Sequence, residues 1–224
     1  MQQEVINPTE NIIAVTHQPL NKLDLASLLS PAELQLLEAI PTIKKIRWVA
    51  GRLAAKAAIK QIPELTGHRL SNLDISLLAQ PDGRPQVLIS TVRNKSLTVS
   101  ISHSQDISVA VADAGELKLG IDIEKIREFS EETIKAFMTK TEFSFYRQLS
   151  AIDQPAFVTK LWCIKEAILK AQGVGLSLHP ARINIDFATD QAITKVSLTG
   201  KTILLQTSWT PYAKSYIIVY TKLL

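Results

Sequence analysis

The sequence predicts an α+β protein made of two similar α/β lobes. The predicted elements occur twice in the order strand, helices, strands along the 224 residues, and the second series begins after a boundary near residue 113. Hydrophobic residues make up 46% of the chain, which is enough for one sizeable core or two small ones. We therefore expect an N-terminal lobe of residues 1–112, a C-terminal lobe of residues 113–224, and a ligand site between the lobes.

Composition narrows the class of protein. Charged residues are 21% of the chain, which does not favour disorder, and the formal net charge of +4 suits an acidic partner or a polyanionic ligand. No basic run is interleaved with aromatic residues, so we expect no nucleic-acid partner. No apolar run approaches the roughly 18 residues of a membrane span. Because no secretion signal is evident either, we expect a cytoplasmic protein without a membrane partner.

The single cysteine, Cys163, excludes an intramolecular disulfide and is expected to pack within a helix.

The elements of the first half begin with a strand and two helices. The strand is predicted at residues 11–16. Ser30 and Glu33 form a capping-box pattern that includes a proline, which predicts a short helix ending at Ala39. A longer helix is predicted at Ile43–Ile62, and these residues are expected to face inward: Ile46, Val49, Leu53 and Ala57.

Short strands complete the first half. They are predicted at Leu73–Leu78, Val87–Ile89, Leu97–Ser102 and Ser108–Ala112. Residues 81–85 form a turn between the first two strands, and Gly83 supplies the backbone freedom that this turn needs. His103 follows the third strand, and residues 113–115 are predicted to form a turn.

The longer helix carries many basic residues: Lys44, Lys45, Arg47, Arg52 and Lys56. Two interpretations are open. The charges either form a solvated face that keeps the protein soluble, or some of them contact the phosphates of a ligand.

Leu119–Arg127 is predicted to be a strand in which acidic and β-branched residues alternate. Asp122 and Glu124 would share one face and lie about 7 Å apart, where their charges repel each other. One interpretation is an edge strand with a solvated acidic face. The other is a site for a hard cation, since Mg²⁺ binds one or two carboxylates together with waters and phosphate oxygens.

Trp162–Ser177 is predicted to be a helix that ends at Gly173 and Gly175. Glu166 and Lys170 lie one turn apart on one face, with Trp162 one turn earlier. A surface ion pair between Glu166 and Lys170 is one interpretation. The alternative is that Glu166 is a third carboxylate of the cation site and Lys170 a phosphate contact. A buried stripe is expected at Leu161, Ile164, Ile168 and Ala171.

Two further helices and four strands are predicted in the second half. The helices are Ser130–Met138 and a segment from Thr139 to Leu149 that begins with a capping box. Their aromatic residues either pack in the core or line a groove for a helix of a protein substrate. Residues 151–155 are expected to form a loop. The strands are expected to form an antiparallel sheet and are predicted at Arg182–Phe187, Ala192–Leu198, Ile203–Trp209 and Tyr216–Thr221.

The motif GIDIEKIR, followed about forty residues later by WCIKEAILKAQGVGLS, resembles the paired signature of the Sfp-type 4′-phosphopantetheinyl transferases. That signature is G-[IV]-D-[IV]-E and then [FW]-x-x-K-E-[AS]-x-x-K-x-x-G. The segment Ser100–Ser104 (SISHS) resembles a further motif of the family, the turn before the metal-binding strand. The resemblance implies a pseudo-dimeric fold and covers most of the chain.

The resemblance implies an enzyme that transfers 4′-phosphopantetheine from CoA to a serine of an acyl or peptidyl carrier protein and releases 3′,5′-ADP. Magnesium, or manganese in its place, would be bound by Asp122, Glu124 and Glu166. The implied catalytic residues are Asp122, Glu166 and Lys170, and Glu166 is a candidate general base, directly or through a water, as well as a metal ligand. Lys165 would orient Glu166 or bind phosphate, and Trp162 would pack under the site.

The resemblance also implies which residues bind CoA. They are Arg47 and Arg52 in an R-x-x-x-G-R pattern, Gly83 and Arg84 in a G-[KR]-P turn, and Ser102, His103, Lys165 and Lys170. Residues 32–39 lack the basic residue that family members often place there for the 3′-phosphate. The expected partners are CoA and carrier proteins of fatty-acid, polyketide or nonribosomal-peptide synthesis, and we expect a monomer. The alternatives are a CoA- or nucleotide-binding module without catalysis and a basic protein that binds nucleic acid or another anionic surface.

Overall fold

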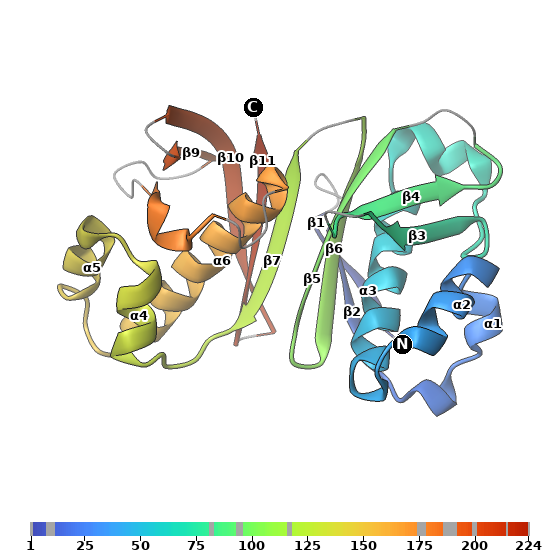
Figure 1. The fold of residues 1–224 in the computed structure, drawn as a ribbon, viewed down its shortest axis with the longest axis horizontal. Helices are drawn as coiled ribbons and strands as arrows, with labels where there is room; N and C mark the ends of the chain where they lie inside the picture. The colour runs from blue at the N-terminus through green and yellow to red at the C-terminus, as the bar shows by residue number, and fades with distance from the viewer. Residues whose placement is uncertain are drawn as a thin grey trace. The chain divides into compact units, whose positions relative to one another are not determined.

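The computed structural model describes residues 2–7, 12–80, 83–92, 96–115, 118–173, 178–185, 192–198, 201–213 and 215–223. The chain forms two compact units, unit 1 at Met1–Leu117 and unit 2 at Lys118–Leu224 (Figure 1). Each unit contains helices and antiparallel strands, which confirms the predicted α+β class. The functions expected of residues 1–112 and 113–224 stay predictions. None of the helices within the described ranges is both long and apolar enough to span a bilayer.

Unit 1 contains a four-stranded antiparallel sheet in the order β1-β2-β6-β5, formed by β1 (Gln3–Asn7), β2 (Ile12–Thr16), β6 (Ile107–Ala114) and β5 (Leu97–Ser104). A separate hairpin pairs β3 (Ile75–Ala79) with β4 (Pro85–Ile89). The helices are α1 (Leu25–Leu28), α2 (Pro31–Ala39) and α3 (Thr42–Lys60), with short 3₁₀ helices at η1 (Leu20–Lys22) and η2 (Pro63–His68). The long helix α3 packs against β2, β5 and β6.

Unit 2 contains a five-stranded antiparallel sheet in the order β7-β11-β10-β9-β8. Its strands are β7 (Leu119–Lys125), β8 (Ile183–Ile185), β9 (Ala192–Leu198), β10 (Lys201–Tyr212) and β11 (Tyr216–Leu223). Between β7 and β8, the described residues form the helices α4 (Glu131–Phe137), α5 (Lys140–Tyr146) and α6 (Gln154–Gln172) and the 3₁₀ helix η4 (Pro180–Arg182). Helix α6 packs against β7 and β11.

The two units share a strand topology that no sequence repeat reveals. In each unit the strand before the long helices, β2 or β7, pairs with the last strand of the unit, β6 or β11. The register is also shared, because Ile13 is opposite Ala110 and Asp122 is opposite Val219, and both members are displaced by 109 residues (122 − 13 and 219 − 110). This correspondence supports the predicted similarity of the two lobes.

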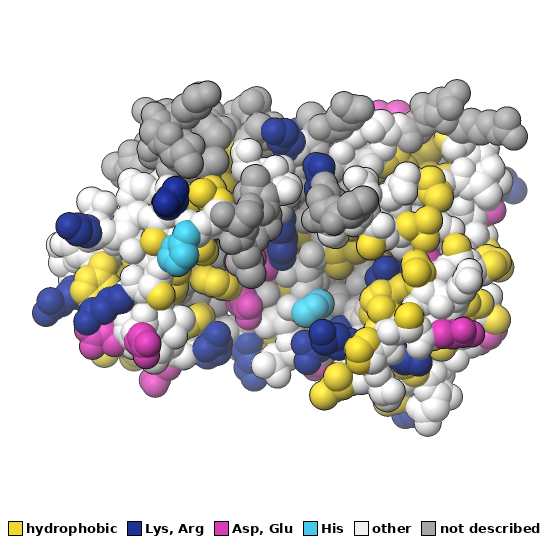
Figure 2. Space-filling view, in the orientation of Figure 1, with side chains coloured by type: hydrophobic (Ala, Val, Ile, Leu, Met, Phe, Trp, Pro, Cys, Tyr) yellow, Lys and Arg dark blue, Asp and Glu magenta, His cyan; other side chains and the backbone are white. Residues whose placement is uncertain are grey.

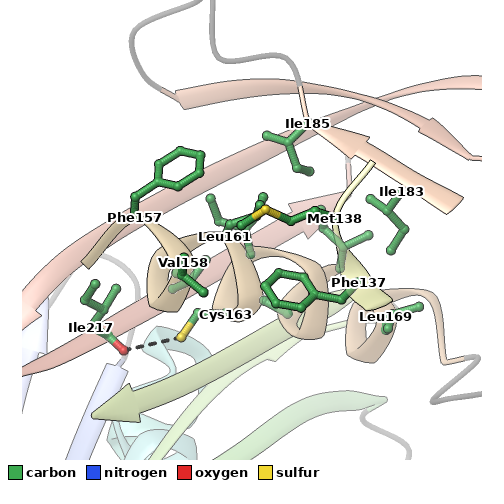
Figure 3. Packing of buried hydrophobic residues seen from close by; sticks show 14 of the residues in the cluster. Phe137, Met138, Phe157, Val158, Leu161, Cys163, Leu169, Ile183, Ile185 and Ile217 are labelled. Carbon is green, nitrogen blue, oxygen red and sulfur yellow. Dashed lines mark hydrogen bonds between the residues drawn. The ribbon is translucent and has the colours of Figure 1, made fainter. Parts of the chain in front are cut away.

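The core of unit 2 lies between α6 and its sheet, as the side chains in Figure 3 show. The predicted apolar stripe is buried, with Leu161 and Ile168 fully enclosed. Helix α6 begins at Gln154, so the predicted loop at residues 151–155 is wrong for its last two residues. Pro155 lies in the first helical turn, where the backbone N–H that proline lacks would have no helical acceptor. The predicted end at Gly173 is confirmed by its left-handed φ of 68°, while Gly175 lies outside the described residues.

In unit 1, the alanine-rich centre of α3 is buried against the sheet, as predicted. Val49 and Leu53 are buried, while Ile46 and Ala57 are only half-buried. The sequence predicts Lys56 as one of several basic residues on the solvated or ligand-binding face of the helix. In the structure its side chain is fully buried, so this prediction is wrong for Lys56. Its Nζ lies 2.5 Å from Glu33 Oε2 and donates hydrogen bonds to two backbone carbonyls, so burial of the charge is compensated.

Several strand boundaries differ from the predicted ones. Strand β5 extends to Ser104, so His103 lies within the strand instead of following it. The turn to β6 is tight and includes Gln105 with a φ of 51°, and β6 continues to Ala114, so only Gly115 of the predicted turn at residues 113–115 lies outside the strand. Cross-strand pairing extends these strands beyond what their local residue preferences indicate. Strand β1 was not predicted, and α5 ends at Tyr146 rather than Leu149.

Candidate active site

Gly120 allows β7 and α6 to approach each other more closely than any other residue would. A Cβ atom added to Gly120 would lie 1.7 Å from Ala167 O and 2.9 Å from Ala171 N, both backbone atoms of α6. The glycine of the GIDIE motif is therefore required by space rather than by its backbone angles. This close approach brings the residues that follow Gly120 within reach of the side chains on α6.

Lys170 of α6 pairs with Asp122 of β7. Its Nζ donates a hydrogen bond to Asp122 Oδ1 at 2.8 Å and another to Ile121 O at 3.0 Å. Asp122 is only 4% exposed, so the interpretation of β7 as having a solvated acidic face is wrong at this residue. The surface ion pair between Glu166 and Lys170 is likewise replaced by the contact between Lys170 and Asp122.

Glu166 of α6 lies near Asp122 and Glu124, two acidic residues of β7. Its pKa is raised by burial and by the negative charges of Asp122 and Glu124, while Lys170 opposes this shift. Its Oε1 is buried and has no hydrogen-bond partner among the described residues. A buried carboxylate oxygen in this state is destabilised, and a bound cation would relieve it.

The three predicted metal ligands are not preassembled as a metal centre. In the part of the chain that the structure describes, no three side chains of His, Cys, Asp or Glu are grouped to hold a metal ion. The chemistry of the site nevertheless fits a hard divalent cation, because its donors are carboxylate oxygens and Glu166 Oε1 lacks a partner among the described residues. The metal ligands Asp122, Glu124 and Glu166 stay a prediction.

Lys165 has contacts that differ from those expected of a CoA ligand. Its side chain is fully buried, and its Nζ donates to Phe137 O at 2.7 Å, Glu142 Oε2 at 2.7 Å and Pro180 O at 3.1 Å. An ammonium group has three N–H donors, so all of them are used inside unit 2. This corrects the expectation that Lys165 binds phosphate, while the alternative, that Lys165 orients Glu166, stays a prediction.

The neighbours of these residues on α6 are part of the core. Trp162 packs edge-on against Phe137, with ring centroids 5.2 Å apart. The Cys163 thiol is buried and lies 3.8 Å from Ile217 O, as the dashed line in Figure 3 shows. Burial and the charges of Asp122 and Glu124 raise the pKa of this thiol well above its usual value, so Cys163 is unsuited to act as a nucleophile. Its predicted packing role is confirmed.

The aromatic residues of α4 and α5 divide between core and surface. Phe137 and Met138 are buried, so core packing is confirmed for them, whereas Phe145 is 40% exposed. On the face drawn in Figure 2, Lys and Arg side chains are interspersed with Asp and Glu side chains over α4 and α5. The predicted groove for a helix of a carrier protein stays a prediction.

The predicted CoA-binding residues of unit 1 lie on several elements. Arg47 of α3, Arg84 beside the β3–β4 turn and His103 of β5 are exposed, whereas Ser102 is buried. Gly83 has a φ of 84°, as expected for the residue that supplies freedom to this turn. Its amide donates to Gln80 O, which fixes the turn next to Arg84.

Arg52 is held within unit 1 rather than extended into solvent. Its guanidinium carbon lies 3.2 Å from the centroid of the Trp48 ring, and its Nε is 4.0 Å from Glu33 Oε1. Burial lowers the pKa of Arg52 to about 10, against the opposing effect of Glu33. In the structure its guanidinium makes an internal cation–π contact with Trp48, and the CoA contact of Arg52 stays a prediction.

His17 is a candidate site residue that the sequence did not indicate. Its Nε2 is hydrogen-bonded to Ser108 Oγ at 2.9 Å, and its backbone N–H donates to Asp106 O. Burial and the nearby His103 and Arg47 lower its pKa, while Asp106 has the opposite effect. The signal that could have found His17 is its position just after the first strand, opposite the turn that follows the SISHS motif.

Comparisons with known proteins agree with the geometry of unit 2. The family model described as the 4′-phosphopantetheinyl transferase superfamily matches residues 118–221. The 4′-phosphopantetheinyl transferase Sfp of Bacillus subtilis is 33% identical over 111 residues, which are 50% of this chain and 47% of that protein. The chain thus spans about half the length of this curated relative.

Shorter proteins are matched over more of their length. The holo-[acyl-carrier-protein] synthase of an Exiguobacterium species is 39% identical over 87 residues, which cover 38% of this chain and 70% of that protein. A solved holo-(acyl-carrier-protein) synthase from Bacillus anthracis, in complex with CoA (3′,5′-ADP), is 24% identical with a TM-score of 0.38, over 47% of this chain and 94% of that one. The chain belongs to the 4′-phosphopantetheinyl transferase superfamily.

Proposed function

We propose that the protein transfers the 4′-phosphopantetheine group of CoA to a serine of an acyl or peptidyl carrier protein and releases 3′,5′-ADP. The observation that carries the proposal is the joint placement of Asp122, Glu166 and Lys170 by β7 and α6, the two elements that hold the family motifs. The relatives named as transferases and synthases support the same reaction class.

In the proposed reaction, the serine oxygen attacks the β-phosphorus of CoA, and the bond from this phosphorus to the oxygen of 3′,5′-ADP breaks. Glu166 accepts the serine proton, either directly or through one water, although a glutamate that also holds the cation is a weaker base than a free one. Lys170, already fixed by Asp122 and Ile121 O, contributes a positive charge toward the phosphates.

A divalent cation, magnesium or manganese, would be held by Asp122, Glu124 and Glu166. When bound, the cation supplies charge neutralisation of the diphosphate and of the leaving group. In unit 1, Arg47, Gly83, Arg84, Ser102 and His103 are proposed to bind the nucleotide part of CoA. A monomeric state and a cytoplasmic location belong to the same proposal.

The test is mass spectrometry of several apo-carrier proteins after incubation with the protein, CoA and Mg²⁺. The expected result is a carrier that gains the mass of phosphopantetheine, with no gain when Asp122→Ala replaces the wild type or when excess chelator is present. CoA binding without any transfer to carriers of all three pathway types would instead support the alternative, a non-catalytic CoA- or nucleotide-binding module. Binding to nucleic acid with steep salt dependence and no CoA requirement would support the other alternative.

A further inference from the structure

The buried pair of Lys165 and Glu142 connects α6 to the other elements of unit 2. Glu142 Oε2 accepts hydrogen bonds from Lys165 Nζ and from the Thr139 amide, and Oε1 accepts one from the Ile185 amide of β8. Lys165 Nζ also donates to the end of α4 and to η4. One ion pair therefore fixes α6 to α4, α5, η4 and β8 at the same time.

Unit 1 contains a matching pair, formed by Lys56 and Glu33. Glu33 also belongs to a capping box, and it also accepts a backbone N–H from a strand, that of Leu77 in β3. Both lysines come from helices of 19 residues, and both lysines and both glutamates have fully buried side chains. The two pairs are related by the same displacement of 109 residues as the strand register (142 − 33 and 165 − 56).

The two pairs differ in what lies beside them. Lys56 is followed by Ala57, whereas Lys165 is followed by Glu166. Successive residues of a helix point in directions about 100° apart, so fixing Lys165 also fixes the direction of Glu166. The buried ion pair thus fixes a helix in both units, but only in unit 2 does its lysine precede a glutamate whose direction is fixed with it.

Glu166 needs such support because its surroundings oppose it. The carboxylates of Asp122 and Glu124 repel the charged form of Glu166, and its Oε1 is buried without a hydrogen-bond partner among the described residues. A small rotation of α6 would relieve the repulsion. That rotation would also pull Lys165 away from three acceptors that hold it in a dry environment, where an unpaired ammonium is very unfavourable.

We propose that Lys165 and Glu142 are positioning residues that fix the rotation of α6 and so hold Glu166 beside Asp122. This inference rests on the proposed transfer reaction. It assigns to Lys165 a role through Glu166 and the rotation of α6, without contact to the phosphates of CoA.

The test compares Lys165→Met with its matched control in unit 1, Lys56→Met. Free energies of unfolding are measured in urea, and kcat and the KM for CoA are measured at saturating carrier protein and Mg²⁺. Both variants are expected to lose stability to a similar extent. Only Lys165→Met should lower kcat, by at least about tenfold, with the KM for CoA within about twofold of wild type, because misplacement of a reacting group affects turnover.

An equal fall of kcat in both variants, an unchanged kcat in Lys165→Met, or a change confined to KM would overturn the inference. If a lysine variant fails to fold, Glu142→Gln and Glu33→Gln undergo the same comparison, since glutamine retains the oxygen that accepts the strand amide. If the wild type itself transfers nothing to any carrier, the proposed function fails and the inference fails with it, whereas the outcomes above, seen with a wild type that does transfer, overturn the inference alone.

Discussion

Lys170 Nζ and Asp122 Oδ1 lie 2.8 Å apart, and this contact joins the two motifs that identify the family. The pair is formed within unit 2, between β7 and α6, with Asp122 almost completely buried. It places a positive charge beside Asp122, and this charge opposes the effect of Asp122 and Glu124 on the pKa of Glu166.

Lys170→Met should therefore affect both stability and transfer. The buried Asp122 would lose its charged partner, and we expect unfolding in urea to require about 1–3 kcal/mol less free energy. Transfer should fall by at least about tenfold in kcat because the phosphates lose a fixed positive charge. A variant with wild-type kcat would contradict the phosphate role of Lys170. Lys135→Met is a suitable control, since Lys135 forms an exposed i,i+4 pair on α4.

Gly120→Ala should displace α6 from β7. The new methyl group would overlap backbone atoms of Ala167 and Ala171, which cannot move independently of the helix. We expect a loss of about 1–3 kcal/mol or more in the free energy of unfolding, together with loss of transfer. Gly67→Ala is the matched control, since a Cβ atom added to Gly67 would have no heavy atom of the described residues within 4 Å. If the two variants have the same free energy of unfolding, the claim that Gly120 is required for the close contact between β7 and α6 is contradicted.

Glu166→Gln should make the protein more stable near neutral pH while abolishing transfer. The pKa of Glu166 is raised above 4.5, so its contribution to stability is complete below about pH 4.5 and is lost as the pH rises through the folded-state pKa. In chelator at about pH 7.5, the variant should melt at a higher temperature than the wild type, and the difference should shrink toward about pH 4.5. A less stable variant at neutral pH would indicate that Glu166 is not repelled by Asp122 and Glu124.

His17→Gln should reduce the pH dependence of stability in mild acid. Burial, His103 and Arg47 lower the pKa of His17 below 6.5, so the unfolded chain binds more protons than the folded chain between the two pKa values. The stability that His17 contributes is thus present above about pH 6.5 and is lost as the pH falls through its folded-state pKa. Melting temperatures from about pH 7.5 to about pH 5 should decline less steeply in the variant. An identical decline in both proteins would be evidence against a lowered pKa, and the exposed His68→Gln serves as the control.

Arg84→Ala and His103→Ala should raise the KM for CoA with little change in kcat. Both side chains are exposed in unit 1, and the proposed function assigns them to the nucleotide part of CoA. Steady-state kinetics with varied CoA measures the effect, which we expect to be about tenfold for each variant. A KM equal to that of the wild type would remove the residue from the proposed site. Arg182→Ala, at an exposed position of unit 2, controls for a general effect of removing positive charge.

Local residue patterns determined much of the fold and the location of the candidate site. The capping boxes at Ser30 and Thr139, the buried stripe of α6 and its end at Gly173 are all confirmed, because these features depend on neighbours within a few positions. The two motifs likewise predict a strand for Asp122 and a helix for Glu166 and Lys170, and the structure has both.

Tertiary structure alone decided which charged residues are buried and which residues they contact. The sequence predicts Lys56 on a basic helix face and Lys165 as a residue of the site, yet both are enclosed by acceptors from segments distant in the chain. Lys170 contacts Asp122 instead of Glu166 because Gly120 lets α6 approach β7 closely. Helical spacing specifies which side chains share a face, but the partner of a charge depends on what the opposite element brings to that face, and this is fixed only when the elements pack.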